Sequence, residues 1–221
     1  MNGIEHNLNE IRQEIGDKVR LVAVSKNHPA VAILEAYQAG QRVFGENRVQ
    51  EILAKQPLLP ADIQWHMIGH LQTNKVRFIA PFISMIQSVD SMKLLSAISE
   101  QALKNSRVID CLLQVFIASE ETKFGFDVNE LTDLLRTIHQ DPLKGIRIRG
   151  LMGMATFTDD TSQIRKEFRE LKSMFDKIRN EYFREESVFN ELSIGMSGDY
   201  LIAIEEGSTI VRIGTKIFGS R

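Results

Sequence analysis

Eight short apolar runs, separated by segments with helical periodicity, are the feature that most limits how this chain of 221 residues can fold. Val, Ile and Phe are frequent in these runs and favour β-strands. The runs are RLVAVS (20–25), QRVFG (41–45), IQWHMIG (63–69), SMIQSV (84–89), DCLLQVFIA (110–118), RIRGLMGMA (147–155), FNELSIGM (189–196) and TIVRIG (209–214). Eight alternations predict an α/β fold with a parallel sheet, and the number favours closure into a (β/α)8 TIM barrel. An open, doubly wound sheet is the alternative.

Amphipathic stripes between the runs predict the helices. Their apolar positions are Val31, Leu34 and Ala39; Val49, Ile52 and Leu53; Leu94, Leu95, Ile98 and Ala102; and Ile164, Phe168, Leu171, Phe175 and Ile178. Asp90 and Ser91 precede the third stripe and supply N-cap chemistry for that helix, and the fourth stripe follows Asp160, Thr161 and Ser162. A further stripe at residues 4–15 precedes the first run, and Gly16 suits a helix end. This extra N-terminal helix could cover the bottom of the barrel.

Charge and composition exclude several classes of partner. The 27 basic and 29 acidic residues nearly cancel, so no overall positive field attracts nucleic acid and no basic run binds a membrane surface. The chain has no Pro/Ser-rich linker, which predicts one domain over residues 1–221. Its first residues lack a signal-peptide pattern, and no segment has the apolar length that spans a bilayer. We therefore expect a cytoplasmic monomer with no nucleic-acid or membrane partner.

Cysteine and histidine give little sign of metal chemistry. Cys111 is the single cysteine, so it cannot form an internal disulfide, and its apolar run predicts a buried side chain. No Cys/His cluster has the spacing of zinc ligands. We expect no metal site.

Polar residues gather where the predicted strands end. In a barrel of this class, functional sites lie at the C-terminal ends of the strands. The residues in those positions are Ser25 and Lys26; Glu46 and Asn47; His70, Gln72 and Asn74; and the segments SEETKFGF (119–126), MATFT (154–158), GMSGDY (195–200) and RIGTKIFG (212–219). These segments supply the candidate site residues.

The last two segments predict an anion site. Ser197 and Gly198 precede a short helical pattern that ends at Gly207, so their amides would lie at a helix N-terminus. Gly214 and Thr215 follow the eighth strand, where bare backbone can approach a ligand and a hydroxyl can donate to it. Phosphate sites in these barrels are often built from the loops after strands seven and eight. The alternative is that the glycines only turn the chain.

Two cations occupy positions that call for an explanation. Lys26 ends an apolar strand and is either a surface lysine just past it or a reactive group. Arg212 lies in a strand that should be buried on both faces, and it needs a carboxylate such as Glu46 or a ligand.

A lysine, an anion site and a buried arginine at one barrel mouth suggest a phosphorylated carbonyl compound held as a Schiff base, since a neutral lysine amine condenses with carbonyls. Pyridoxal 5′-phosphate would meet all three, with its aldehyde on Lys26, its phosphate near Ser197 and Thr215, and its ring nitrogen facing Arg212. A class I aldolase substrate would meet only the first two.

Six motifs together resemble a known family. The motifs are AVSKNHP, FGENRVQE, WHMIGHLQTNKV, GLMGMAT, LSIGMSGDY and GSTIVRIGTKIFGSR, and they resemble the pyridoxal phosphate homeostasis proteins, also called proline synthase co-transcribed homologues. The resemblance implies a barrel like the N-terminal domain of alanine racemase, with pyridoxal phosphate on Lys26. It implies cofactor contacts at Asn47, Met196, Ser197, Arg212, Gly214 and Thr215. His70 stands where many members have proline, which leaves the shape of that loop open.

The resemblance also implies a carrier more than an enzyme. Racemisation needs two acid/base groups on opposite faces of the substrate carbon. In alanine racemase the second is a tyrosine from another domain, whereas Tyr37, Tyr182 and Tyr200 here fall in helical patterns. We therefore expect a protein that stores pyridoxal phosphate or delivers it to apoenzymes, with effects on amino-acid and keto-acid metabolism. The alternatives are a racemase or lyase using an unrecognised second group such as His66, and a cofactor-free aldolase.

Overall fold

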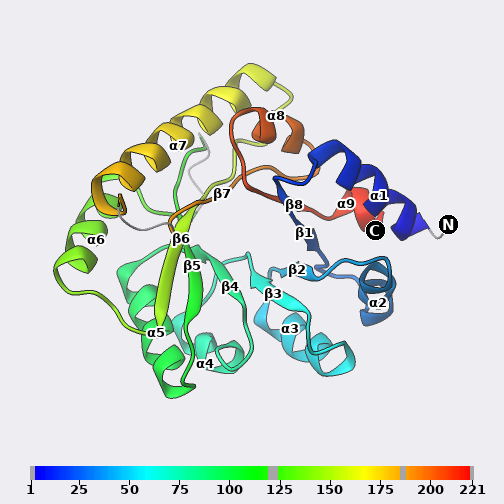
Figure 1. Ribbon diagram of the computed structural model, residues 1–221, viewed down its shortest axis with the longest axis horizontal. Coiled ribbons are helices and arrows are strands. Elements are labelled where there is room, and N and C mark those ends of the chain that lie inside the picture. The colour runs from blue at the N-terminus through cyan, green and yellow to red at the C-terminus, as the bar shows by residue number, and fades with distance from the viewer. Residues whose placement is uncertain (1–2, 119–123, 185–187, 220–221) are drawn as a thin grey trace.

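The eight apolar runs form parallel strands that close into a barrel in the order β1 to β8 (Figure 1). The computed structural model describes residues 3–118, 124–184 and 188–219. The strands are β1 (Arg20–Val24), β2 (Val43–Glu46), β3 (Gln64–Met67), β4 (Met85–Val89), β5 (Ile109–Gln114), β6 (Ile146–Met152), β7 (Glu191–Ser193) and β8 (Ile210–Ile213). Because β1 also pairs in parallel with β8, the predicted (β/α)8 TIM barrel is confirmed and the open sheet is excluded.

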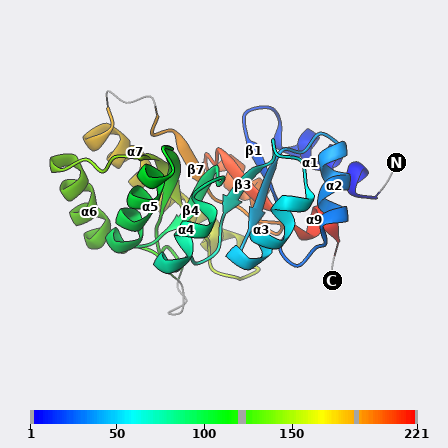
Figure 2. The same ribbon diagram turned by 90° about the horizontal axis from the view of Figure 1, so that it is seen from below.

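Helices surround the strands on the outside of the barrel (Figures 1 and 2). They are α1 (Gly3–Ile15), α2 (Ala30–Gln38), α3 (Val49–Lys55), α4 (Val76–Ile79), α5 (Met92–Lys104), α6 (Val128–Gln140), α7 (Thr161–Tyr182), α8 (Tyr200–Glu205) and α9 (Thr215–Phe218), with 3-10 turns at Gln56–Leu58 and Thr73–Lys75. Ser91 caps α5 by accepting from the Leu94 amide at 3.2 Å, and Asp160 accepts from the amide of Ser162 at the start of α7. Of the polar residues that the sequence places before these two helices, Ser91 and Asp160 are therefore the caps.

The first helix occupies a different place from the one expected. Instead of covering the bottom, α1 packs on the outside of the barrel against α2, α8 and α9 (Figure 1). Leu8 and Ile11 are buried there, and the Asn7 side chain donates to the Ile217 carbonyl at 3.0 Å. The reason is that α9, which follows β8, has only four residues. Since so short a helix cannot cover the apolar outer face of β8 and β1, α1 completes the ring of helices.

The core has two layers. The larger one lies between the strands and the helices, and a small cluster fills the inside of the barrel with Val22, Met85, Leu112, Met152 and Ile210. Cys111 is fully buried in the outer layer, as predicted, and burial raises the pKa of its thiol. Arg212 lies two residues after Ile210, so both side chains lie on the inner face of β8, and Arg212 is the nearer of the two to the C-terminal end of the barrel.

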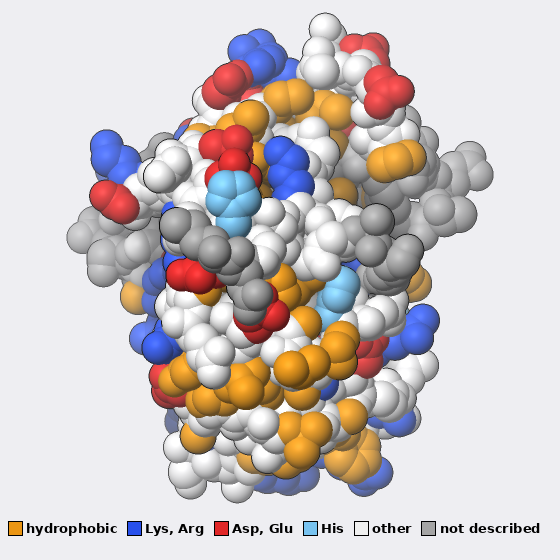
Figure 3. Space-filling view, turned by 90° about the vertical axis from the view of Figure 1, so that its right-hand side faces the viewer, with side chains coloured by type: hydrophobic (Ala, Val, Ile, Leu, Met, Phe, Trp, Pro, Cys, Tyr) orange, Lys and Arg blue, Asp and Glu red, His pale blue; other side chains and the backbone are white. Residues whose placement is uncertain are grey.

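Not every predicted helix face is correct. In α2, Ile33 and Ala36 are buried, whereas Val31 is 69% exposed. The segment offers two apolar stripes, and only its packing against neighbouring elements decides between them. On the side of the molecule in Figure 3, residues of both charges are interspersed with exposed hydrophobic side chains. Among the residues described, none of the helices combines the length and apolarity that crossing a lipid bilayer requires.

Candidate functional site

A cavity of about 730 Å³ opens at the C-terminal ends of the strands. Its wall includes all seven residues predicted from the sequence, namely Lys26, Asn47, Met196, Ser197, Arg212, Gly214 and Thr215. They follow or end β1, β2, β7 and β8, which the closed barrel brings to one rim. In the predicted segment 119–126, residues 119–123 lie outside the described part of the chain, and Phe124 lines the cavity.

The loop after β1 carries Lys26 into the cavity wall. Lys26 is half-buried, and the following Asn27 adopts φ of 62°, a left-handed conformation that asparagine tolerates better than most residues. The amide of His28 donates to the Ser25 carbonyl at 3.0 Å, which closes a tight turn around the lysine. Lys26 therefore lies in the wall of the cavity and not on the open surface beyond the strand.

The loop after β2 depends on a close backbone approach. A Cβ atom on Gly69 would lie 2.4 Å from the carbonyl oxygen of Asn47, so only glycine fits beside this residue. The Ser88 hydroxyl donates to the Gly69 carbonyl at 2.6 Å, which ties the loop after β3 to β4. Asn47 is thus held at the rim by the loop after β3.

The loops after β7 and β8 meet at the predicted anion site. Ser197 Oγ accepts from the Gly214 amide and lies 3.2 Å from the hydroxyl oxygen of Thr215. Within the described chain, the amides of Ser197, Gly198 and Thr215 donate no hydrogen bond. The nearby Asp199 carboxylate accepts from the Met196 amide at 2.5 Å, which closes the turn. Two hydroxyls and several available amides therefore converge on one corner of the cavity.

Arg212 is buried in the cavity floor, with 4% of its surface exposed. Its guanidinium donates to the carbonyl and hydroxyl oxygens of Ser193 at 2.8 and 2.6 Å and to the Gly153 carbonyl at 2.9 Å. All three acceptors are neutral. Burial lowers the pKa of Arg212 to about 10, against a weaker opposing effect of Asp199. The sequence-based alternative of an ion pair with Glu46 is wrong, because Glu46 instead pairs with Lys55 at 2.6 Å.

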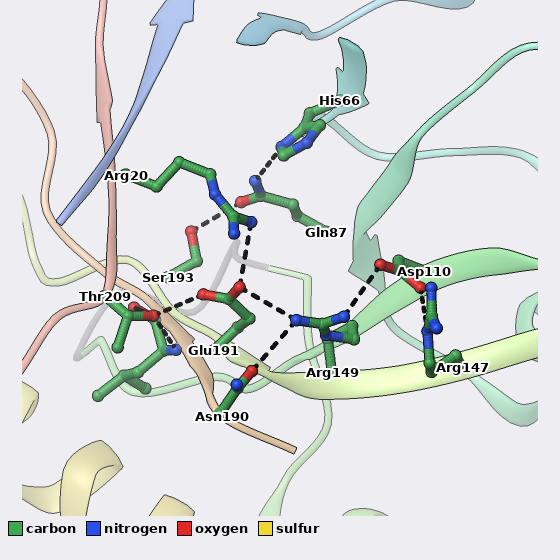
Figure 4. A network of polar contacts seen from close by, with 11 residues as sticks. Arg20, His66, Gln87, Asp110, Arg147, Arg149, Asn190, Glu191, Ser193 and Thr209 are labelled. Atoms are coloured by element: carbon green, nitrogen blue, oxygen red, sulfur yellow. Dashed lines mark hydrogen bonds and ion pairs between the residues drawn. The ribbon is translucent and has the colours of Figure 1, made fainter. Parts of the chain in front are cut away.

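A directed chain of hydrogen bonds runs from Arg212 into the barrel interior. The Ser193 hydroxyl, which accepts from Arg212, donates to Gln87 Oε1 at 2.7 Å, and Gln87 Nε2 lies 2.9 Å from His66 Nδ1 (Figure 4). An amide nitrogen only donates, so His66 Nδ1 accepts and the imidazole is neutral. Burial lowers the pKa of His66 to about 3.

His66 therefore does not suit the role of second acid/base group. It lies inside the barrel, and it is not among the described residues that line the cavity. A group with a pKa near 3 also holds a proton too weakly for catalysis near neutral pH.

The tyrosines lie away from the cavity, as their helical patterns predicted. The Tyr200 ring is buried, and its hydroxyl bonds Glu14 and accepts from Lys216 at 2.9 Å. Tyr37 donates to Asp62 at 2.7 Å on the outside of the barrel. None of the three tyrosines is among the described lining residues.

His70 and Gln114 also line the cavity, although neither is among the seven predicted cofactor contacts. His70, which the sequence placed at a strand end and marked as a departure from the family, stacks on Phe124 with ring centroids 4.1 Å apart, and its Nδ1 lies 3.0 Å from Asp90 Oδ2. Gln114 at the end of β5 is buried and donates to the Phe124 carbonyl at 2.7 Å. An amide within an otherwise apolar strand was the signal that could have identified Gln114.

Comparison with known proteins agrees with this geometry. A family model described as "Alanine racemase, N-terminal domain" matches residues 1–221. Proteins named pyridoxal phosphate homeostasis protein are 40% identical in Aquifex aeolicus, over 91% of this chain and 87% of the relative, and 38% identical in Schizosaccharomyces pombe, over 100% and 94%. The chain belongs to the family of pyridoxal phosphate homeostasis proteins.

Solved structures extend the family likeness to the fold. The structure of PipY from Synechococcus elongatus with PLP bound is similar at 38% identity and a TM-score of 0.89, covering 98% of this chain and all of that one. An alanine racemase from Clostridium difficile shares the barrel with a TM-score of 0.73. At 16% identity, and with 57% of that enzyme covered, this second likeness concerns the fold alone.

Proposed function

We propose that this protein binds pyridoxal phosphate in the cavity at the barrel mouth and takes part in intracellular pyridoxal phosphate homeostasis, by storage or delivery. The observation that carries the proposal is the Arg212 guanidinium, which is buried in the cavity floor on neutral acceptors. A buried cation of this kind favours a ligand with electron-rich groups. The names of the relatives and the PLP-bound PipY structure support the same ligand.

The residues of the cavity fit the three functional parts of this cofactor. When bound, pyridoxal phosphate supplies an aldehyde that condenses with a neutral lysine amine and releases water. We assign Lys26 to that covalent bond and Arg212 to the pyridine nitrogen. Ser197 and Thr215 hold the phosphate through hydroxyl and amide donors, and Gly214 lets the backbone approach it closely. Asn47 and Met196 flank the ring.

We infer that the protein is a carrier and not an enzyme. An arginine facing the pyridine nitrogen keeps that nitrogen unprotonated, which weakens electron withdrawal from a bound amino acid. The positions of the tyrosines and the low pKa of His66 also count against a second acid/base group at these residues. Residues 1–221 act as one cytoplasmic, monomeric unit in this proposal, with apoenzymes that use pyridoxal phosphate as recipients.

One observation favours a second candidate function, an amino-acid racemase or lyase. His70 lines the same cavity as Lys26, and Asp90 is positioned to hold its Nδ1 atom. An imidazole oriented by a carboxylate is a common general base. The measurement is whether the purified protein inverts the configuration of amino acids or cleaves them. Such turnover, lost in His70→Asn and in Lys26→Ala, would establish this function in place of the carrier.

The decisive experiment is reductive trapping. Borohydride treatment of the protein with pyridoxal phosphate should fix the cofactor to the peptide that contains Lys26, as read by mass spectrometry. Lys26→Ala should abolish this product completely, while phosphate contacts still allow weak, non-covalent binding. Lys75→Ala is the matched control, because Lys75 follows β3 at the same end of the barrel but is not among the described lining residues. Normal trapping in Lys26→Ala would refute the assignment.

A further inference from the structure

A second lysine, Lys55 at the end of α3, lies just behind the loop that carries Lys26. Lys55 is 8% exposed, which is unusual for a lysine. Its ammonium group donates to the Ser25 carbonyl at 2.9 Å, to Glu46 Oε1 at 2.6 Å and to Glu51 Oε2 at 2.8 Å. All three of its donors are therefore used.

These contacts hold the backbone on both sides of Lys26. Lys55 donates to the carbonyl of Ser25, the residue that precedes Lys26. Glu51 Oε2 accepts at 2.6 Å from the amide of Asn27, the residue that follows Lys26. The left-handed conformation of Asn27, with φ of 62°, requires such external support more than ordinary backbone does. Helix α3 thus fixes both peptide groups that decide where the Lys26 side chain starts.

The arrangement is costly as a purely structural device. Glu46 has no exposed surface, and burial raises the pKa of its carboxyl, against the hydrogen bonds from Lys55 and Ser25 that lower it. Glu46 Oε2 has no hydrogen-bond partner within the described chain. Apolar residues of similar volume often stabilise a protein as well as a buried ion pair does. Charged groups at this place are better explained by the bonds they direct to the lysine loop.

We propose that Lys55, Glu46 and Glu51 form a positioning clamp that presents the Lys26 amine to the cofactor aldehyde. The proposal rests on the proposed function, in which Lys26 makes the covalent bond. The clamp residues act through the backbone of residues 25–27, and none of them is among the described lining residues of the cavity. The clamp should therefore affect binding that needs the covalent bond and leave phosphate and ring contacts intact.

Glu51→Ala gives the cleanest test, because it removes the acceptor for the Asn27 amide while the pair of Lys55 with Glu46 remains. Two ligands separate the contributions: pyridoxal phosphate, and pyridoxine 5′-phosphate, which has an alcohol in place of the aldehyde. Glu51→Ala should weaken pyridoxal phosphate binding at least about tenfold, through loss of a charged hydrogen bond. It should change pyridoxine phosphate binding less than about twofold, within the scatter expected for an unaffected site.

Two further variants complete the design. Glu51→Gln keeps an oxygen acceptor of the same length and should restore most of the pyridoxal phosphate affinity. Glu100→Ala breaks an exposed pair with Lys104 at the same helical spacing and should change neither ligand. Equal weakening of both ligands by Glu51→Ala, or no weakening of either, overturns the clamp while wild-type trapping on Lys26 upholds the proposed function. Wild-type protein that fails to trap on Lys26 overturns both.

Discussion

The two ends of the barrel accommodate arginine in different ways. At the N-terminal end, Arg20 lies 3.1 Å from Glu191, and Arg149 lies 3.5 Å from both Glu191 and Asp110 (Figure 4). Arg147 completes the network with Asp110 at 2.7 Å. At the C-terminal end, Arg212 contacts only neutral oxygens among the described residues.

Under the proposed function, this difference separates residues that stabilise the fold from residues that bind the cofactor. At the N-terminal end the arginines form ion pairs with carboxylates of the protein, so these charges hold neighbouring strands together and need no ligand. Where the guanidinium rests on carbonyl and hydroxyl groups, its charge remains available to a bound molecule. This agrees with the general division of such barrels into a structural end and a functional end. Substitutions at the two ends should consequently change different measurable quantities.

The largest effect is expected for Arg212→Met. This variant should reduce the stabilisation that pyridoxal phosphate adds to the protein by about 1.5 to 3 kcal/mol, the worth of a hydrogen bond to a charged group. Thermal unfolding with and without the cofactor measures that increment. If pyridoxal phosphate stabilises Arg212→Met as much as it stabilises the wild type, the contrast between the two ends is wrong, because the arginine would then be structural at this end too.

Arg149→Met should show the opposite pattern. Its removal leaves Asp110 and Glu191 with fewer partners, and we expect the free energy of unfolding to fall by about 1 to 3 kcal/mol. The cofactor-dependent increment should not change, because Arg149 lies at the far end of the barrel. Denaturant unfolding of the free and the loaded protein tests both statements. A lowered cofactor affinity would show that the two ends are coupled.

The hydrogen-bond chain inside the barrel, which ends at His66, gives a pH-dependent effect. The folded-state pKa of His66 is about 3, below the ordinary value of 6.5, so the unfolded chain binds a proton that the folded chain does not within this window. The free energy of unfolding should therefore fall as pH falls from about 6.5 to about 3, with a slope of at most about 1.4 kcal/mol per pH unit from this group.

His66→Gln keeps an acceptor for Gln87 and should flatten that part of the profile. His6→Gln, at an exposed position on α1, is the control for the substitution itself. Unfolding curves recorded across this pH range provide the measurement. An unaltered slope in His66→Gln would mean that other groups account for the acid sensitivity.

Three features could be predicted from the sequence: the number and order of the strands, capping residues before α5 and α7, and the cavity residues at the ends of β1, β2, β7 and β8. Each of these follows from local chemistry: hydrophobic periodicity, capping side chains, and the rule that sites gather at the C-terminal ends of parallel strands. The predicted residues therefore came together once the barrel closed.

Features that depend on contacts between distant parts of the chain could not be predicted from local patterns. Only the tertiary structure placed α1 in the helix ring instead of at the bottom, because α9 is too short to cover β8. It chose the buried face of α2 between two apolar stripes. In the folded chain Glu46 pairs with Lys55 and not with Arg212, and Arg212 donates instead to Ser193 and Gly153. Pairing among buried charges depends on distances within the folded chain, and no local pattern in a single sequence carries that information.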